Sequence, residues 1–324
     1  MEYIDISDKQ ITKRQHYVPK AYLKNFAIED QGTPQVYAVF SEEIESKLVS
    51  IDNICCRNYL YDQIAIDPES NTHIFVAPNE IEDSFIQLEG EYAAIVSKMK
   101  EALLVRNDFE LSTPEIGKIK IFMSLLIWRN PIFIHILKCT IDRLYNQDLE
   151  HIEATRNKFP DIPPNLLVAY FANNQLKKYL SIATLAMAET MQNSKICIIK
   201  AQRSLFVTSD IPVVNIYGEK LGIEYDLMGM PITPDLFLAF IDTDYPVPKV
   251  VTVDDSQVKR INGKQVGGAR RLLISNSDEL LSYVAYSYEQ EDDSWLYQMI
   301  HMDKETALRE YREIMNSKEI KYWK

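Results

Sequence analysis

A histidine and an aspartate of this sequence have the side chains and the settings that acid–base chemistry needs. His16 titrates near neutral pH, follows Arg14 closely and precedes a predicted helix start, where backbone N–H groups favour anions. Asp210 follows a predicted strand at residues 205–208 and precedes an x-Pro pair, so its carboxylate can project from the strand end into a cleft. We therefore predict catalytic roles for His16 and Asp210. The alternatives are that His16 caps the helix and that Asp210 forms an Asx turn with its own backbone.

Four further polar residues are predicted to bind a substrate: Arg14, Arg129, Ser209 and Asn262. Arg129 stands at a predicted helix break, where its guanidinium can hold a phosphate or carboxylate through two hydrogen bonds. It can equally cap the carbonyls of the preceding helix. Asn262 can hold a substrate through its amide, although the Asn-Gly pair that it begins is also an ordinary signal for a turn or a helix end.

The sequence predicts no metal site and indicates no cofactor. The other histidines show neither HExxH nor HxH spacing, and the adjacent Cys55 and Cys56 are too close together for a CxxC clamp. The cysteines are interpreted as small buried side chains in a reducing compartment. Glu82 and Glu89 fall on one side of a predicted helix, where they could bind a divalent cation, but a solvated face is the favoured interpretation. The GxGxxG, P-loop, GxSxG and kinase signatures are absent.

The formal net charge of −12 argues against a general nucleic-acid coat, because such a protein repels polyanions at long range. Local basic clusters nevertheless occur; they could form a basic cleft for a nucleotide or nucleic acid, although a solvated face is the favoured interpretation of such clusters on an acidic protein. The clusters are Lys9, Lys13, Arg14, Lys20 and Lys24, and then Lys259, Arg260, Lys264, Arg270 and Arg271. The first residues are acidic and polar, and no uncharged apolar run reaches about 18 residues. We therefore expect no membrane span and a cytoplasmic location.

The elements that must position these residues change in type along the chain. Short runs rich in Val, Ile, Tyr and Phe predict strands over residues 34–76 and again after residue 193. Apolar spacing and start signals predict helices between them, one of them opened by the Ser112–Glu115 capping box. Later elements are predicted as helices at 254–261, 266–274 and 303–320 and a strand at 282–288.

This order predicts an α+β fold, with N-terminal and C-terminal antiparallel β segments around a central helical region. The chain (1–324) is interpreted as a single domain, with a further division into parts 1–112, 113–193 and 194–324. The 46% hydrophobic residues are an ordinary globular value, which argues against disorder.

Four ordered motifs are similar to those of a bacterial family. They are RQHYVPKAYLKNF (residues 14–26), WRNP (128–131), TSDIPV (208–213) and PITP (231–234), and an Ile-Asn pair follows at 261–262. The series resembles family four-two-three-eight of the domains of unknown function over nearly the whole chain. Ile211 departs from the asparagine that this family usually has in its Ser-Asp-x-Pro motif. The scattered bacterial distribution of the family resembles that of horizontally transferred phage-defence genes, and the resemblance implies no reaction and no catalytic residue.

Two hypotheses of function follow. In the first, the protein is a hydrolase or transferase acting on a phosphate-bearing substrate, such as a nuclease-like defence or toxin effector. His16, Arg14, Asp210 and Asn262 then converge in one pocket, with Arg129 as an anion clamp. In the second, the protein is a non-enzymatic binding or interaction module, and the same motifs are structural caps and turns that neighbouring backbone satisfies.

Overall fold

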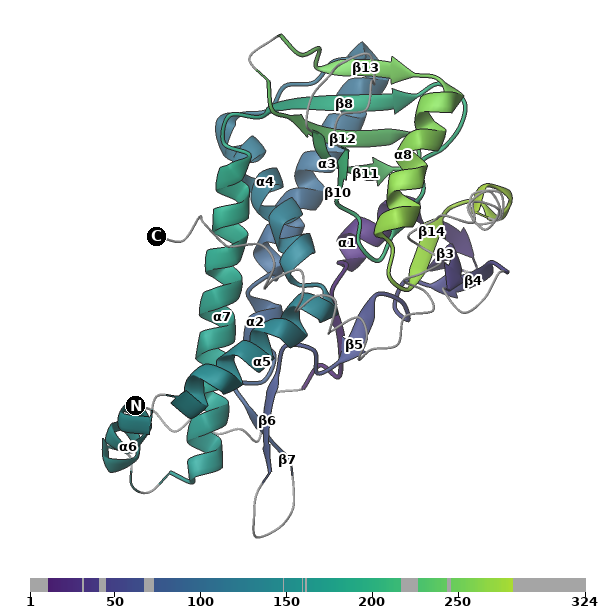
Figure 1. The fold of residues 1–324 in the computed structure, drawn as a ribbon. Coiled ribbons are helices and arrows are strands. Elements are labelled where there is room, and N and C mark those ends of the chain that lie inside the picture. The colour runs from purple at the N-terminus through teal and green to yellow at the C-terminus, as the bar shows by residue number, and fades with distance from the viewer. Residues whose placement is uncertain are drawn as a thin grey trace.

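The computed structural model describes residues 11–30, 32–40, 45–66, 73–147, 149–158, 160, 162–216, 227–243 and 246–281. Strands occupy both ends of this part of the chain and helices its middle, so the predicted α+β class is confirmed (Figure 1). The helices are α1 (Lys20–Leu23), α2 (Glu80–Asp83), α3 (Ile86–Arg106), α4 (Thr113–Trp128), α5 (Pro131–Gln147), α6 (Leu149–Lys158), α7 (Pro164–Thr190) and α8 (Asp255–Gly268), with a 3-10 turn at Lys24–Phe26.

The strands form two sheets of five strands and two ribbons of two. In chain order they are β1 (Arg14–His16), β2 (Ile28–Asp30), β3 (Thr33–Phe40), β4 (Lys47–Ser50), β5 (Cys56–Asn58), β6 (Gln63–Ile66), β7 (His73–Val76), β8 (Lys195–Ala201), β9 (Thr208–Ser209), β10 (Val214–Ile216), β11 (Leu227–Thr233), β12 (Leu236–Ile241), β13 (Val250–Val253) and β14 (Leu272–Ser275).

One large sheet has the order β10-β11-β12-β8-β13 and is built only from the C-terminal part of the chain. The other has the order β2-β3-β14-β9, with β4 also paired to β3, so it joins strands from both ends of the described chain. The ribbons are β1–β5 and β6–β7. Pairing between the described strands is antiparallel, as predicted, except that β13 runs parallel to β8.

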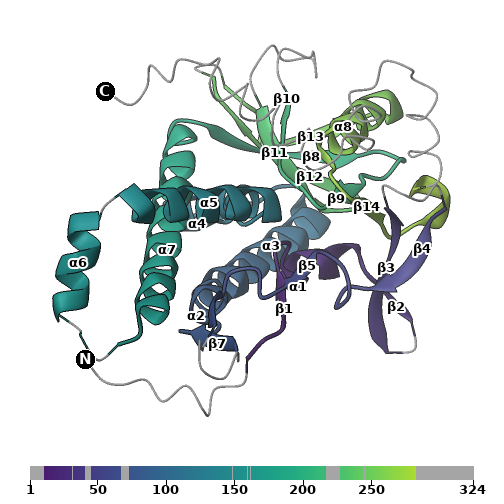
Figure 2. The ribbon, with the colours of Figure 1, turned by 60° about the horizontal axis from the view of Figure 1, so that its bottom comes forward.

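Strand β12 is buried along its whole length because helices cover both faces of its sheet (Figures 1 and 2). Successive side chains of a strand point to opposite faces. Leu238 and Phe240 accordingly lie in one hydrophobic core with Phe122 of α4. The alternating Phe237 lies in another core with Ile261 of α8. The continuous apolar run of β12 is thus explained by burial on both faces.

The central helices begin and pack as their sequence patterns predict. The Ser112–Glu115 capping box is present, with the Glu115 carboxylate accepting from the Ser112 N–H at 2.7 Å. On α3 the apolar stripe is buried, and the ring of Tyr92 stacks on that of Phe122 at 3.7 Å between centroids. No helix in the described ranges is by itself long and apolar enough to cross a membrane. Helices α4 and α5 meet the length and composition criteria only as a pair, and that pair is bent by 72°.

The predicted helix at residues 266–274 is wrong. Helix α8 continues without interruption from Asp255 to Gly268, and Leu272–Ser275 form β14. The four residues of β14 are all buried between β3 and β9, so their apolar run belongs to a central strand. The strand predicted at 282–288 and the helix predicted at 303–320 lie outside the described residues.

Candidate functional site

His16 lies in strand β1 and not at a helix cap. Its neighbour across the ribbon is Cys56. The helix that follows, α1, begins after Pro19, and no side chain caps the N-terminus of this helix. The imidazole is buried, and its Nε2 lies 3.2 Å from the carbonyl oxygen of Ile51. Because a carbonyl can only accept, Nε2 carries the proton and Nδ1 is the basic nitrogen. Burial lowers the pKa of His16 to about 4, so the ring is neutral at pH 7.

Arg129 is the largest fully buried side chain among the described residues, and its guanidinium is held by the protein on every side. Nε donates to the hydroxyl of Tyr61 at 3.0 Å, Nη1 to the carboxylate of Glu89 at 2.6 Å, and Nη2 to the main-chain oxygen of His16. The cation also lies 4.5 Å from the ring centroid of Phe85. This arginine therefore joins the end of α4 to β1 and to α3.

Glu82 was assigned by sequence to a solvated face, but it is largely buried beside Arg129. Its Oε1 accepts from the His16 N–H at 3.3 Å, while its buried Oε2 has no hydrogen-bond partner in the described structure. Burial raises the pKa of Glu82 to about 7, against the opposing charge of Arg129. The sequence signal for this site was the seven-residue spacing of Glu82 and Glu89, whose carboxylates both lie near Arg129.

Ser209 and Asp210 form a buried corner at the end of β9. The Ser209 hydroxyl accepts from the Ile211 N–H at 3.1 Å and lies 3.1 Å from the side-chain oxygen of Gln265. The Asp210 carboxylate accepts from the Arg270 N–H at 2.8 Å. Burial raises the pKa of Asp210, and hydrogen bonds from the backbone at residues 270–272 oppose that rise. Both side chains thus bind main-chain groups of the protein.

Asn262 lies in the middle of α8, so the predicted turn or helix end at Asn-Gly is wrong. Its Oδ1 accepts from the Val207 N–H at 3.0 Å, and its Nδ2 donates to the Leu205 carbonyl at 2.9 Å. One turn later, Gln265 donates to the Pro212 carbonyl at 2.6 Å. Through these hydrogen bonds the two amides attach residues 205–212 to α8.

The motif segments that are far apart in sequence meet at one place, which we call the motif junction (residues 14–26, 128–131, 208–213, 231–234 and 261–265). Arg129 contacts the main chain of His16, and the next residue, Asn130, donates to the main-chain oxygen of Asp210 at 3.5 Å. The Tyr22 hydroxyl lies 2.8 Å from that of Thr208 and donates to the Pro231 carbonyl at 2.6 Å. Hydrogen bonds therefore connect every segment of the junction.

Next to these contacts lies a buried group of ionisable side chains, Tyr17, Cys55 and Asp210. The N–H of Tyr17 donates to the carbonyl of Cys55 at 2.9 Å, and Cys55 has a left-handed backbone (φ 50°), which a non-glycine residue rarely adopts. Burial raises the pKa of the Cys55 thiol, and the nearby Asp210 raises it further. This thiol is therefore protonated at neutral pH and is not an activated nucleophile.

Exposed basic residues surround the β1–β5 ribbon, and we call them the basic rim (Arg14, Lys20, Arg57 and Arg271). Burial raises the pKa of Tyr17, and Arg271 and Arg57 are close enough to oppose that shift. Burial likewise raises the pKa of Cys56, and Arg14, Lys20 and Arg57 oppose it. Arg57 therefore acts on both side chains, together with Arg271 at Tyr17 and together with Arg14 and Lys20 at Cys56.

The members of the basic rim differ in what they bind. Arg14 donates to the side chain of Asn53, and Lys20 forms an ion pair with Asp52 at 2.5 Å. The guanidinium groups of Arg57 and Arg271 are exposed and make no hydrogen bond or ion pair with the described residues, although the charge of Arg271 is close enough to Asp210 to oppose the rise in its pKa. Their guanidinium donors thus face solvent. Within the same described ranges, no three His, Cys, Asp or Glu side chains are grouped so that they could hold a metal ion.

Comparison with known proteins identifies a family without giving an activity. Neither the curated proteins nor the solved structures contain a match to the chain. Residues 14–279 match a family described as protein of unknown function (DUF4238), and this span includes every segment of the motif junction. The chain is therefore a member of the DUF4238 family.

Proposed function

We propose that the protein binds a phosphate-bearing ligand, a nucleotide or nucleic acid, at the basic rim of the motif junction. The observation that carries this proposal is a pair of exposed arginines, Arg57 and Arg271, which come from distant parts of the chain and whose guanidinium groups make no hydrogen bond or ion pair with the described residues. An arginine fork matches a phosphate with two parallel hydrogen bonds and remains charged at every physiological pH.

The proposed reaction is hydrolysis or group transfer on that ligand, as in a nuclease-like defence or toxin effector. His16 supplies a neutral imidazole with Nδ1 as its basic atom, on the same strand β1 as Arg14. The low pKa that burial gives this ring makes it a weak base, so its contribution to rate is smaller than that of a histidine titrating near pH 7.

A second function, a non-enzymatic binding module, is favoured by a different observation. The polar atoms of Ser209, Asp210, Asn262 and Arg129 bind other groups of the protein, mostly backbone. In that case the motif junction is a structural corner, and the basic rim alone contacts the ligand.

Ligand binding is tested with a fluorescein-labelled single-stranded oligonucleotide and with ATP, by fluorescence anisotropy and calorimetry at low salt. We expect the double variant Arg57→Gln/Arg271→Gln to bind about tenfold more weakly or worse than the wild type, because two phosphate contacts are lost. The matched control is Arg106→Gln/Arg156→Gln, which removes the same charge from exposed positions on α3 and α6. Equal affinity of the wild type and the first double variant would refute the proposal.

The reaction is tested separately by incubating labelled oligonucleotide and nucleotide with the wild type and with His16→Gln. Glutamine keeps a donor for the Ile51 carbonyl but has no basic nitrogen. The enzyme hypothesis is supported if the wild type turns over the ligand and His16→Gln binds it without turnover. Binding without any turnover by the wild type supports the second function.

A further inference from the structure

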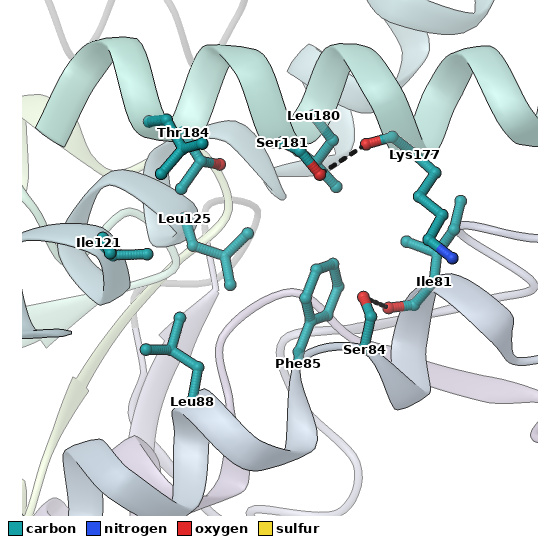
Figure 3. Close-up of a pocket in the computed structure, with 11 residues that line it drawn as sticks. Ile81, Ser84, Phe85, Leu88, Ile121, Leu125, Lys177, Leu180, Ser181 and Thr184 are labelled. Carbon is teal, nitrogen blue, oxygen red and sulfur yellow. Dashed lines mark hydrogen bonds between the residues drawn. The ribbon is translucent and has the colours of Figure 1, made fainter.

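Beside the motif junction, whose Arg129 packs against Phe85, a pocket of about 280 Å³ opens between α2, α3, α4 and α7 (Figure 3). Its walls are mainly apolar. The apolar lining residues are Ile81, Phe85, Leu88, Ile121, Leu125, Leu180 and Leu185. Such a cavity between packed helices is a common form of small-molecule site.

One polar group in this pocket has no partner. Thr184 of α7 is only 5% exposed, and its hydroxyl makes no hydrogen bond with any described residue. A helical Ser or Thr usually bonds to the carbonyl four residues earlier, as Ser181 does with Lys177 at 2.8 Å. Figure 3 shows the oxygen of Thr184 turned toward the space between the helices. The structure therefore presents a buried donor and acceptor to whatever fills the pocket.

The remaining polar lining residues already have partners. Lys177 forms an ion pair with Glu80 at 2.6 Å, and Asn173 donates to the same carboxylate at 2.8 Å. The Ser84 hydroxyl donates to the carbonyl of Ile81 at 2.6 Å. The pocket thus offers no unpaired charge, which favours a neutral occupant over an anion or a cation.

The volume sets the size of the occupant. An engineered apolar cavity of about 150 Å³ holds benzene, and a cavity nearly twice as large has room for two fused rings. The ring of Phe85 at the wall adds a surface for aromatic contact. We propose that this pocket binds a neutral, flat, mostly apolar molecule of about ten to twelve heavy atoms, with one hydroxyl or carbonyl that bonds to Thr184. This site is independent of the function proposed for the motif junction.

The test uses 2-naphthol and, as its partner without a hydroxyl, naphthalene. Calorimetry and ligand fluorescence should show saturable binding of 2-naphthol to the full chain at one site, tighter than naphthalene by about fivefold or more. Thr184→Val keeps the shape of the side chain and should remove that preference, whereas Thr184→Ser should retain it. Thr190→Val, at an exposed position on the same helix, is the matched control.

Two results would overturn the proposal. One is the absence of saturable binding of 2-naphthol by the wild type. The other is an undiminished preference for 2-naphthol in Thr184→Val. If that variant fails to fold, the preference of the wild type for 2-naphthol over naphthalene decides alone, and equal binding of the two compounds overturns the site.

Discussion

The buried carboxylate of Glu82 predicts a contribution to stability that is lost as the pH rises from about 4.5 to about 7, and Glu82→Gln should remove that contribution. The pKa of Glu82 is raised from 4.5 to about 7 in the folded protein, mainly by burial. Between these two values the folded chain keeps a proton that the unfolded chain has released. The contribution of Glu82 to the free energy of unfolding therefore falls as the pH rises from 4.5 to about 7, and this contribution is constant above that range.

The size of the effect follows from the two pKa values. Compared with a pH well below 4.5, where Glu82 is protonated in both states, its ionisation lowers the free energy of unfolding by about 1 kcal/mol at about pH 5. At about pH 8 the decrease is about 3 kcal/mol. Glutamine keeps the volume and an oxygen for the His16 N–H but does not ionise. We expect Glu82→Gln to be more stable relative to the wild type at the higher pH, by about 2 to 3 kcal/mol more than at the lower one.

His16 contributes to the pH dependence of the free energy of unfolding with the opposite sign, so the Glu82→Gln variant should reveal the contribution of His16. Burial lowers its pKa from 6.5 to about 4, so the unfolded chain binds a proton that the folded chain refuses between these values. Stability from His16 is therefore lost as the pH falls through that window. In the wild type the two slopes largely cancel, and in Glu82→Gln the slope of His16 is left without its counterpart.

The assay is urea unfolding of the wild type, Glu82→Gln and Ser84→Ala at a series of pH values. Ser84→Ala, a change on the adjoining turn, has no titrating group and should differ from the wild type by the same amount at every pH. The charged neighbours of Glu82, which are Arg129, Glu89 and Asp62, are present in all three proteins. A difference between Glu82→Gln and the wild type that does not change with pH would refute the reasoning.

Four further variants test the packing and the motif junction by denaturant unfolding. Gly229→Ala should destabilise by about 1 to 3 kcal/mol, because its Cβ would lie 2.3 Å from the ring of Phe237, whereas Gly117→Ala, with open space on α4, should stabilise by up to about 1 kcal/mol. Arg129→Met should cost about 3 to 5 kcal/mol, since it leaves a carboxylate and a buried carbonyl without their donor; a loss below about 1 kcal/mol would contradict the described contacts. Asn262→Ala should cost about 2 kcal/mol through the two main-chain groups it leaves unpaired, and full retention of the melting temperature would show that residues 205–207 do not depend on this amide.

The sequence predicted those parts of the fold that depend on local rules. The capping box at Ser112 and the apolar stripe of α3 appear as expected, because both depend on residues within one or two helical turns. The predicted extent of α8 was wrong because Gly263 suggested that the helix ends there. Contacts of Asn262 with a segment more than fifty residues away hold the helix through that point, and no local pattern reports them.

The candidate site shows the same division. The motif residues do come together, and Arg129 does end a helix, but the groups that it binds could not be read from its surroundings in the sequence. His16 forms a strand only because Cys56 lies across from it, forty residues later. Glu82 and Glu89 looked like solvated acids because their partner, Arg129, comes from another helix. Roles that depend on tertiary partners could therefore not be predicted from the sequence.

The pairing of β3 with β14 has a consequence for the time at which this fold can be completed. Phe40 and Leu272 are partners in the sheet although 232 residues separate them. At a synthesis rate of about 5 to 20 residues per second, β14 emerges roughly ten to fifty seconds after β3. During that interval β3 is paired with β2 and β4 but not with β14. The backbone groups of β3 that β14 will bind are therefore unpaired, and they can pair with another nascent chain. The N-terminal strands therefore depend on the ribosome reaching residue 275, and a chain released earlier is expected to aggregate through β3.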